Sequence, residues 1–160
     1  MPNTLPTPNT QNILNYPPAL AAALQALYDQ GATTLQLALT FATADAAILY
    51  TVPTGIRLCV GRAFWEVTTT FAGGTSSAIG LSSSNTNYTT KGDLLGGASG
   101  DVAAGLGSTV KFQGTIGAKA ASQGVIVLVA GDTIRFDRIT SAFTSGVAIA
   151  HVPVRLLPAS

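Results

Sequence analysis

The stretch VIVLVAGDTIRFDRIT, from Val125 to Thr140, contains one of the two longest unbroken apolar runs in the chain. Its first half predicts a buried strand over residues 125–130, and its second half alternates apolar and polar residues as a strand over residues 133–139. The AGD sequence between them is typical of a tight reversal. The stretch therefore predicts two strands joined by a turn, with Asp132 as a turn residue.

The second of these strands carries charges of opposite sign. Arg135 and Asp137 share one of its faces, and Ile134 and Phe136 share the other. Neighbours two positions apart on one strand face can pair. We therefore expect Arg135 and Asp137 to form a surface or interface ion pair rather than an acid/base couple.

Patterns of period two continue on both sides of this stretch. The segments that predict further strands are TLQLALT (34–40), AILYTV (47–52), IRLCVGRAFWEVTTTF (56–71), SAIGLS (77–82) and the run 147–157. In segment 56–71, Leu58 and Val60 fall on the face opposite to Trp65 and Val67. We expect one long strand here, with apolar residues on both faces.

The middle of the chain, residues 85–124, is rich in Gly, Ala, Ser and Thr. A connection of this length without structure is uncommon in a compact domain, so we expect a large loop with short local elements and contacts of its own. Within it, TKGD (90–93) has capping-box spacing before Leu94 and Leu95 and predicts one helical turn.

The N-terminal part divides into an arm and a helix. Residues 1–18 are rich in Pro and Asn, which predicts an extended arm that is either a disordered tail or ordered against a neighbouring subunit. Residues 19–31 carry apolar side chains at helical spacing up to Gly31 and predict a short amphipathic helix. Such a helix packs on its own domain or on a neighbour. We therefore divide the chain into residues 1–31 and a β domain over residues 32–160.

Composition limits the partners of this protein. Hydrophobic residues make up 47% of the chain, charged residues only 9%, and the formal net charge is +1. So few charges give little protection against self-association, and we expect a homo-oligomer. The basic residues are neither in surplus nor clustered, which disfavours nucleic acid as a partner. We find no pattern for a membrane span or a signal peptide.

The residues available for catalysis are few. His151 is the only histidine and Glu66 the only glutamate. A histidine-rich metal site therefore has too few ligands, and a Ser-His-Asp arrangement would depend on one imidazole in an apolar strand. We expect no metal, no cofactor and no enzymatic activity; an enzyme built on Glu66, His151 and an Asp is the least favoured hypothesis. Cys59 lies in an apolar run and is expected to be a buried, inert thiol.

Three segments carry a family resemblance: TVPTGIRLCVGRAFWEVTTTFAGGTSSAIGLSSSN, TKGDLLGG and VIVLVAGDTIRFDRITSAFTSGVA. Over residues 34–157, their strand order and turn sequences resemble tailed-bacteriophage virion proteins, in particular β-sandwich capsid cement or decoration proteins. The resemblance implies a mainly β, jelly-roll-like sandwich that forms a homotrimer. It also implies that the protein, made in the host cytoplasm, binds the major capsid protein at subunit junctions on the outer capsid surface.

In this role, a few large side chains would anchor the interfaces. The candidates are Ile13, Leu14, Tyr16, Leu24, Tyr28, Trp65, Phe71, Tyr88 and Phe143. Each aromatic among them has an alternative as a plain core residue. A second hypothesis for the whole protein is a tail or fibre module that binds a host glycan through residues 85–124 and Tyr88.

Overall fold

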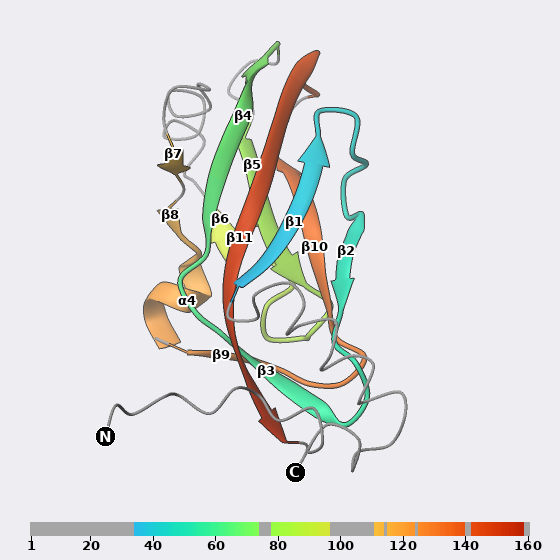
Figure 1. Ribbon diagram of the computed structural model, residues 1–160, viewed down its shortest axis with the longest axis vertical. Helices are drawn as coiled ribbons and strands as arrows, with labels where there is room; N and C mark the ends of the chain where they lie inside the picture. The colour runs from blue at the N-terminus through green and yellow to red at the C-terminus, as the bar shows by residue number, and fades with distance from the viewer. Residues whose placement is uncertain are drawn as a thin grey trace, which may run out of the picture.

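The computed structural model describes residues 34–73, 78–96, 111–113, 115–123, 125–139 and 142–158. Across these ranges the chain is mainly β, with two antiparallel sheets and one short helix, α4 (Ala118–Gln123) (Figure 1). The prediction of a mainly β fold is confirmed. The predicted arm and helix over residues 1–31 lie outside the described residues.

The first sheet, which we call the β11 sheet, is built around one long strand. Its six strands are β1 (Thr34–Thr40), β3 (Ile56–Val60), β4 (Phe64–Ala72), β7 (Lys111–Gln113), β9 (Ile126–Leu128) and β11 (Ser145–Pro158). The first part of β11 pairs antiparallel with β1 and β4, and its last residues, from Val154 to Pro158, pair with β3. β9 pairs with β3, and β7 pairs with β4.

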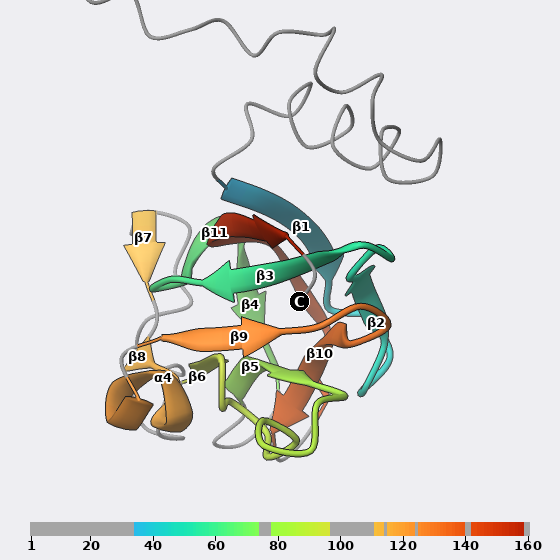
Figure 2. The same ribbon diagram turned by 90° about the horizontal axis from the view of Figure 1, so that it is seen from below.

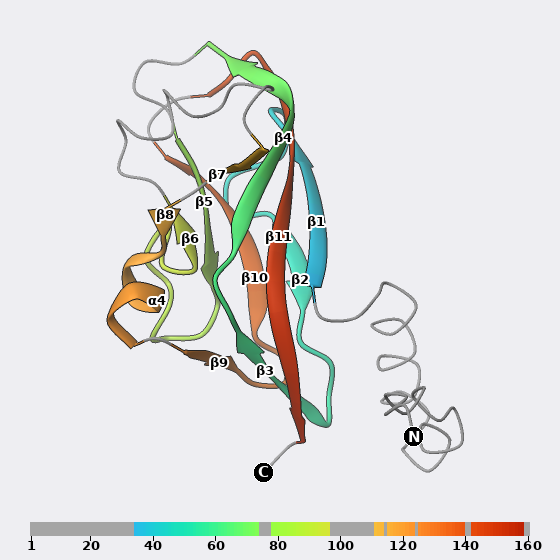
Figure 3. The ribbon, with the colours of Figure 1, turned by 60° about the vertical axis from the view of Figure 1, so that its left-hand side comes forward.

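The second sheet, the β5 sheet, faces the first. Its five strands follow the order β2 (Ile48–Thr51), β10 (Thr133–Ile139), β5 (Ala78–Ser83), β6 (Leu95–Gly96) and β8 (Thr115–Ile116). Figure 3 shows the layers, with β4, β11 and β1 on one side and β5 and β6 on the other. The arrangement is a β-sandwich.

The hydrophobic core lies between the two sheets. In β1, Leu35 and Leu37 are buried while Gln36 and Ala38 are exposed, as the alternating pattern predicts. In the β5 sheet, Phe136 of β10 pairs with Leu81 of β5, and both are at most 1% exposed. Paired residues have side chains on the same face of a sheet, so the residues between these positions point away from the core.

Segment 56–71 forms two strands and not the one long strand that its pattern predicts. β3 ends at Val60 and β4 begins at Phe64. The link between them changes the alternation, so that Leu58 and Trp65, expected on opposite faces, are both buried in one core. The expected continuous strand with two apolar faces is therefore wrong.

The predicted reversal at residues 130–132 is confirmed, with Gly131 at a φ of 86°. The strands that it joins, β9 and β10, belong to different sheets. This turn therefore carries the chain from one layer of the sandwich to the other.

The TKGD sequence forms a turn before β6 and not the predicted helical turn. The capping bond is present, because the Thr90 amide donates to the Asp93 carboxylate (2.9 Å). However, Leu95 pairs with Leu81 of β5, and a residue in this strand pairing cannot continue a helical turn from residues 90–93. The sheet overrides the local capping signal.

Candidate functional site

Glu66 and His151 are the two candidate catalytic groups that the fold brings together. They lie on the paired strands β4 and β11, with Nε2 of His151 2.8 Å from Oε2 of Glu66. The His151 ring stacks on Phe64, with ring centroids 5.0 Å apart. Within the described ranges, no group of three or more His, Cys, Asp or Glu residues could hold a metal ion. The contacts seen for His151 fix its ring on the outer face of the β11 sheet.

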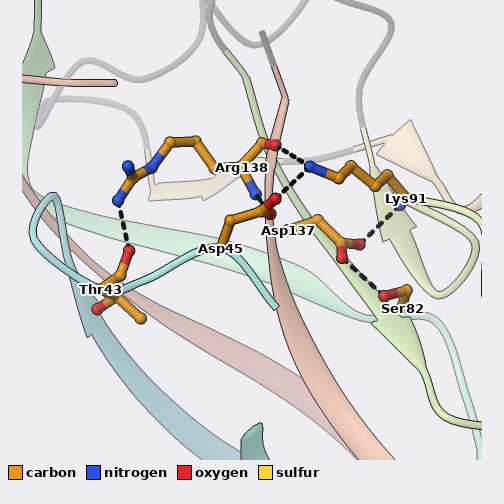
Figure 4. Close-up of polar contacts among 7 residues, drawn as sticks. Thr43, Asp45, Ser82, Lys91, Asp137 and Arg138 are labelled. Atoms are coloured by element: carbon orange, nitrogen blue, oxygen red, sulfur yellow. Dashed lines mark hydrogen bonds and ion pairs between the residues drawn. The ribbon is translucent and has the colours of Figure 1, made fainter. Parts of the chain in front are cut away.

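A second polar cluster lies on the outer face of the β5 sheet, under residues 84–94, which we call the covering loop. Asp137 of β10 is 3% exposed and its carboxylate accepts hydrogen bonds from the Ser82 hydroxyl (2.7 Å) and the Gly92 amide (2.9 Å) (Figure 4). Burial raises the pKa of Asp137, and the two hydrogen bonds offset this only in part.

The predicted ion pair of Arg135 with Asp137 is wrong. The Arg135 Nε donates instead to the Thr133 hydroxyl (3.1 Å), and the Asp137 carboxylate is bound by Ser82 and the covering loop. The physical reason is that the loop covers the strand face on which Asp137 lies, so this carboxylate is not on a surface.

Lys91 ties the covering loop to the connection between β1 and β2. Its Nζ donates to Oδ2 of Asp45 (2.6 Å) and to the Arg138 carbonyl (2.6 Å). Oδ1 of Asp45 accepts from the Arg138 amide (2.8 Å), and the Arg138 guanidinium donates to the Thr43 carbonyl (2.6 Å). Burial alone would raise the pKa of Asp45, but the hydrogen bonds from Lys91 and Arg138 outweigh it and lower the pKa. Figure 4 shows these contacts converging on Arg138.

Glycines allow the covering loop to lie directly on β5. A Cβ atom at Gly80 would be 3.1 Å from the Leu95 carbonyl oxygen and 3.2 Å from the Gly92 Cα atom. Gly92 has a φ of 80°, a conformation that favours glycine. All six residues of β5 are buried, so the chain itself closes this face over β5, whereas Ile48 of β2, which pairs with Arg135, is 61% exposed.

Asp132 holds the start of the covering loop. Its Oδ2 accepts from the side-chain amide of Asn85 (2.8 Å) and from the Val129 amide (2.8 Å). These contacts confirm Asp132 as a turn residue. They also connect the turn between the sheets to the loop that covers β5.

The outer face of the β11 sheet has a different character. Gln36 and Ala38 of β1 are exposed, and Phe64, Ile149 and Pro153 on the neighbouring strands are half-buried. Most of these side chains are apolar or uncharged, and each keeps part of its surface in contact with solvent. A partly exposed sheet face with few charged side chains is the kind of surface that another protein covers.

Cys59 also lies on this face. It pairs with Arg155 of β11 and is half-buried, whereas its neighbours Leu58 and Val60 point into the core. The prediction of a buried thiol is therefore wrong, because an apolar run does not by itself show which residues of a strand face inward.

The aromatic interface candidates within the described residues are core residues. Trp65 is 1% exposed, Tyr88 7%, and Phe71 and Phe143 8% each. The Tyr88 hydroxyl donates to the side chain of Gln123 (3.1 Å), so its ring is not open to a sugar. The remaining candidates, Ile13, Leu14, Tyr16, Leu24 and Tyr28, lie outside the described residues.

Sequence reasoning missed the large apolar side chains that are exposed. Among the described residues they are Phe41 (39%), Ile48 (61%), Val125 (53%) and Val129 (45%). Two of them flank β9, in the run that was expected to form a fully buried strand. The signal was present, because such a run places apolar residues on both faces, but a strand in a two-layer sandwich has only one face toward the core.

No protein-family model, curated protein or solved structure matches this chain. Among the described residues, none of the helices has the length and apolar character needed to cross a bilayer. A functional assignment therefore depends on the two sheet faces and on the charges near them.

Proposed function

We propose that this protein is a virion structural subunit: a jelly-roll-like capsid cement or decoration protein that oligomerises, as a trimer, and binds the outer shell of a tailed bacteriophage. One observation carries the proposal. The chain covers the outer face of β5, within the β5 sheet, with its own loop, and it leaves partly exposed, mostly uncharged side chains on the outer face of the β11 sheet.

The physical argument concerns solubility and burial. With 9% charged residues, the protein has few charges to keep copies apart, so a sheet face with few charged side chains favours association. Stable interfaces bury about 1,000 Å² or more of total surface, an area that a sheet face of this kind can supply. A ligand that binds only the folded shell stabilises it by mass action. A cement subunit needs this buried area and no catalytic group.

The test uses shells of the phage that encodes the protein, prepared without it. Purified protein is added and the shells are sedimented, and their heat resistance is measured with and without it. We expect stoichiometric co-sedimentation and a higher disruption temperature. Failure to co-sediment would remove the proposal, and a native mass equal to one chain would remove the trimer.

A matched pair of variants locates the contact. Ile149→Lys places a charge on the outer face of the β11 sheet, and Thr89→Lys places the same charge on an exposed position of the covering loop. We expect Ile149→Lys to weaken oligomerisation or shell binding by tenfold or more, about 1.4 kcal/mol, because the new charge and the Glu66 carboxylate directly opposite it would both be desolvated there. Thr89→Lys should behave as wild type. Equal behaviour of the two variants would exclude this face as an interface.

A further inference from the structure

The end of the sandwich formed by β3, β9 and the last part of β11 presents a distinct surface. Figure 2 looks onto this end, where β3 and β9 run side by side in opposite directions. Their register places Val127, Cys59 and Arg155 in one row across the three strands. These side chains point outward, since Leu58 and Leu128 in the adjacent row are 0% exposed and form the core.

The edge strand of this end carries a stripe of valines. Val125 and Val129 are 53% and 45% exposed, and Val127 between them is half-buried. Ile126 and Leu128 supply the inward face, so the valines are not needed for the core. Natural edge strands usually carry Lys, Pro or a bulge that prevents association. This edge has none of these at its outward positions.

Positive charge predominates around the stripe, although the Asp132 carboxylate accepts a hydrogen bond from the Val129 amide at one end of it. Arg155 is exposed at the end of the central row, and Arg62 is exposed on the link after β3. The sequences of β3, β9 and β11 contain no Asp or Glu. The charge pattern complements an apolar surface bordered by carboxylates.

We propose that this end of the sandwich, which we call the valine end (Val125, Val127, Val129, Cys59, Arg62 and Arg155), docks an apolar protein surface bordered by Asp or Glu. The inference rests on the proposed function in naming the capsid shell as the source of that surface. The central valines would supply apolar burial, and the arginines would fix the orientation and favour encounter at low salt.

Cys59 provides the measurement, because it is the only cysteine of the chain and lies in the middle of the valine end. Its rate of alkylation by a maleimide is measured for the protein alone, for the protein with shells, and for the protein with each of two synthetic peptides. One peptide alternates Glu and Val, and the other alternates Lys and Val. We expect shells and the Glu peptide to slow labelling by at least about threefold, with high salt restoring the rate. The Lys peptide should have no effect.

The outcomes separate this inference from the proposed function. If shells bind the protein but leave Cys59 labelling unchanged, the valine end is not the docking site and the proposed function stands. If the Glu peptide protects Cys59 and shells do not bind, the docking chemistry stands and the proposed function falls. If the Glu peptide gives no protection, or if vesicles of anionic lipid protect Cys59 instead, the inference is overturned.

Variants give a second readout. Arg155→Glu should abolish protection by the Glu peptide and transfer it to the Lys peptide, because it reverses the charge beside Cys59. Ile48→Ser, which removes the exposed apolar side chain of β2 in the other sheet, is the matched control and should leave protection unchanged. Protection by the Glu peptide that survives Arg155→Glu would contradict the proposed complementarity.

Discussion

The two outer faces of this sandwich differ in how far the chain itself covers them. On the β5 sheet, the covering loop lies on β5, and Asp137 is buried with two hydrogen bonds. On the β11 sheet, side chains of β1, β4 and β11 keep contact with solvent, and the polar pair of Glu66 with His151 lies among them. Over β5, the first face is completed within the chain. The second supports association, because its partly exposed side chains would gain burial from a partner.

The largest expected effect comes from removing the buried carboxylate. Asp137→Ala leaves the Ser82 hydroxyl and the Gly92 amide without their acceptor, and we expect the free energy of unfolding to fall by about 2 kcal/mol. Glu66→Ala on the other face should cost about 0.5 kcal/mol or less, since water can reach the half-buried His151. Urea denaturation measures both. Equal losses would show that the faces do not differ in the way described.

A smaller effect is expected from a single methyl group under the covering loop. Gly80→Ala places a Cβ atom within 3.1 Å of the Leu95 carbonyl oxygen, and we expect a loss of about 1 kcal/mol with displacement of the loop. Trypsin cleavage after Lys91 should then become faster. The control is Ala38→Ser on the exposed side of β1, which should change neither measurement. Unchanged cleavage in Gly80→Ala would mean that the loop does not depend on this contact.

The ion pair that ties down the loop should contribute less. The side chains of Lys91 and Asp45 are 48% and 44% exposed, so solvent screens their attraction. We expect Lys91→Met to lower stability by about 0.5 kcal/mol, with the loss smaller at high salt. Thermal unfolding at low and high salt tests this. A loss as large as that of Asp137→Ala would mean that the Lys91–Asp45 pair holds the covering loop as strongly as the hydrogen bonds of Asp137 do.

The smallest effects are opposite changes in pH dependence. Because the pKa of Asp137 is raised in the folded state, its stabilising effect is present below the unfolded pKa and is lost as pH rises through the folded pKa. The pKa of Asp45 is lowered, so its contribution is present above the unfolded pKa and is lost as pH falls through the folded pKa. Asp137→Asn should remove the first dependence and Asp45→Asn the second. Unfolding free energies across the acidic range test this, and changes of the same sign in both variants would contradict it.

Much of the fold follows from local pattern. The bounds of β1 and β10 match the predicted strands at residues 34–40 and 133–139, because each alternates without interruption. The break between β3 and β4 does not follow, since the alternation looks continuous across it. Only pairing with β11, which holds both pieces, shows where the strand is interrupted.

The polar cluster around Asp137 could not be predicted from the sequence either, because it also depends on contacts between distant parts of the chain. Asp137 finds its partners 55 and 45 residues away, at Ser82 and Gly92. Local spacing suggested Arg135 as the partner, but the covering loop excludes solvent from Asp137 and supplies its hydrogen bonds. By contrast, Asp132 was predicted correctly because a turn residue is defined by its immediate neighbours.

The long strand β11 has a mechanical consequence. It forms ladders with β1, β4 and β3 along its length, so a force that pulls β11 along its axis against these strands acts parallel to them. Under such a load the interstrand hydrogen bonds are sheared together and do not open one after another from a free end. Resistance to pulling is set by the rate of unfolding, so it can exceed what equilibrium stability alone suggests. A subunit built in this way can carry tension along the axis of β11.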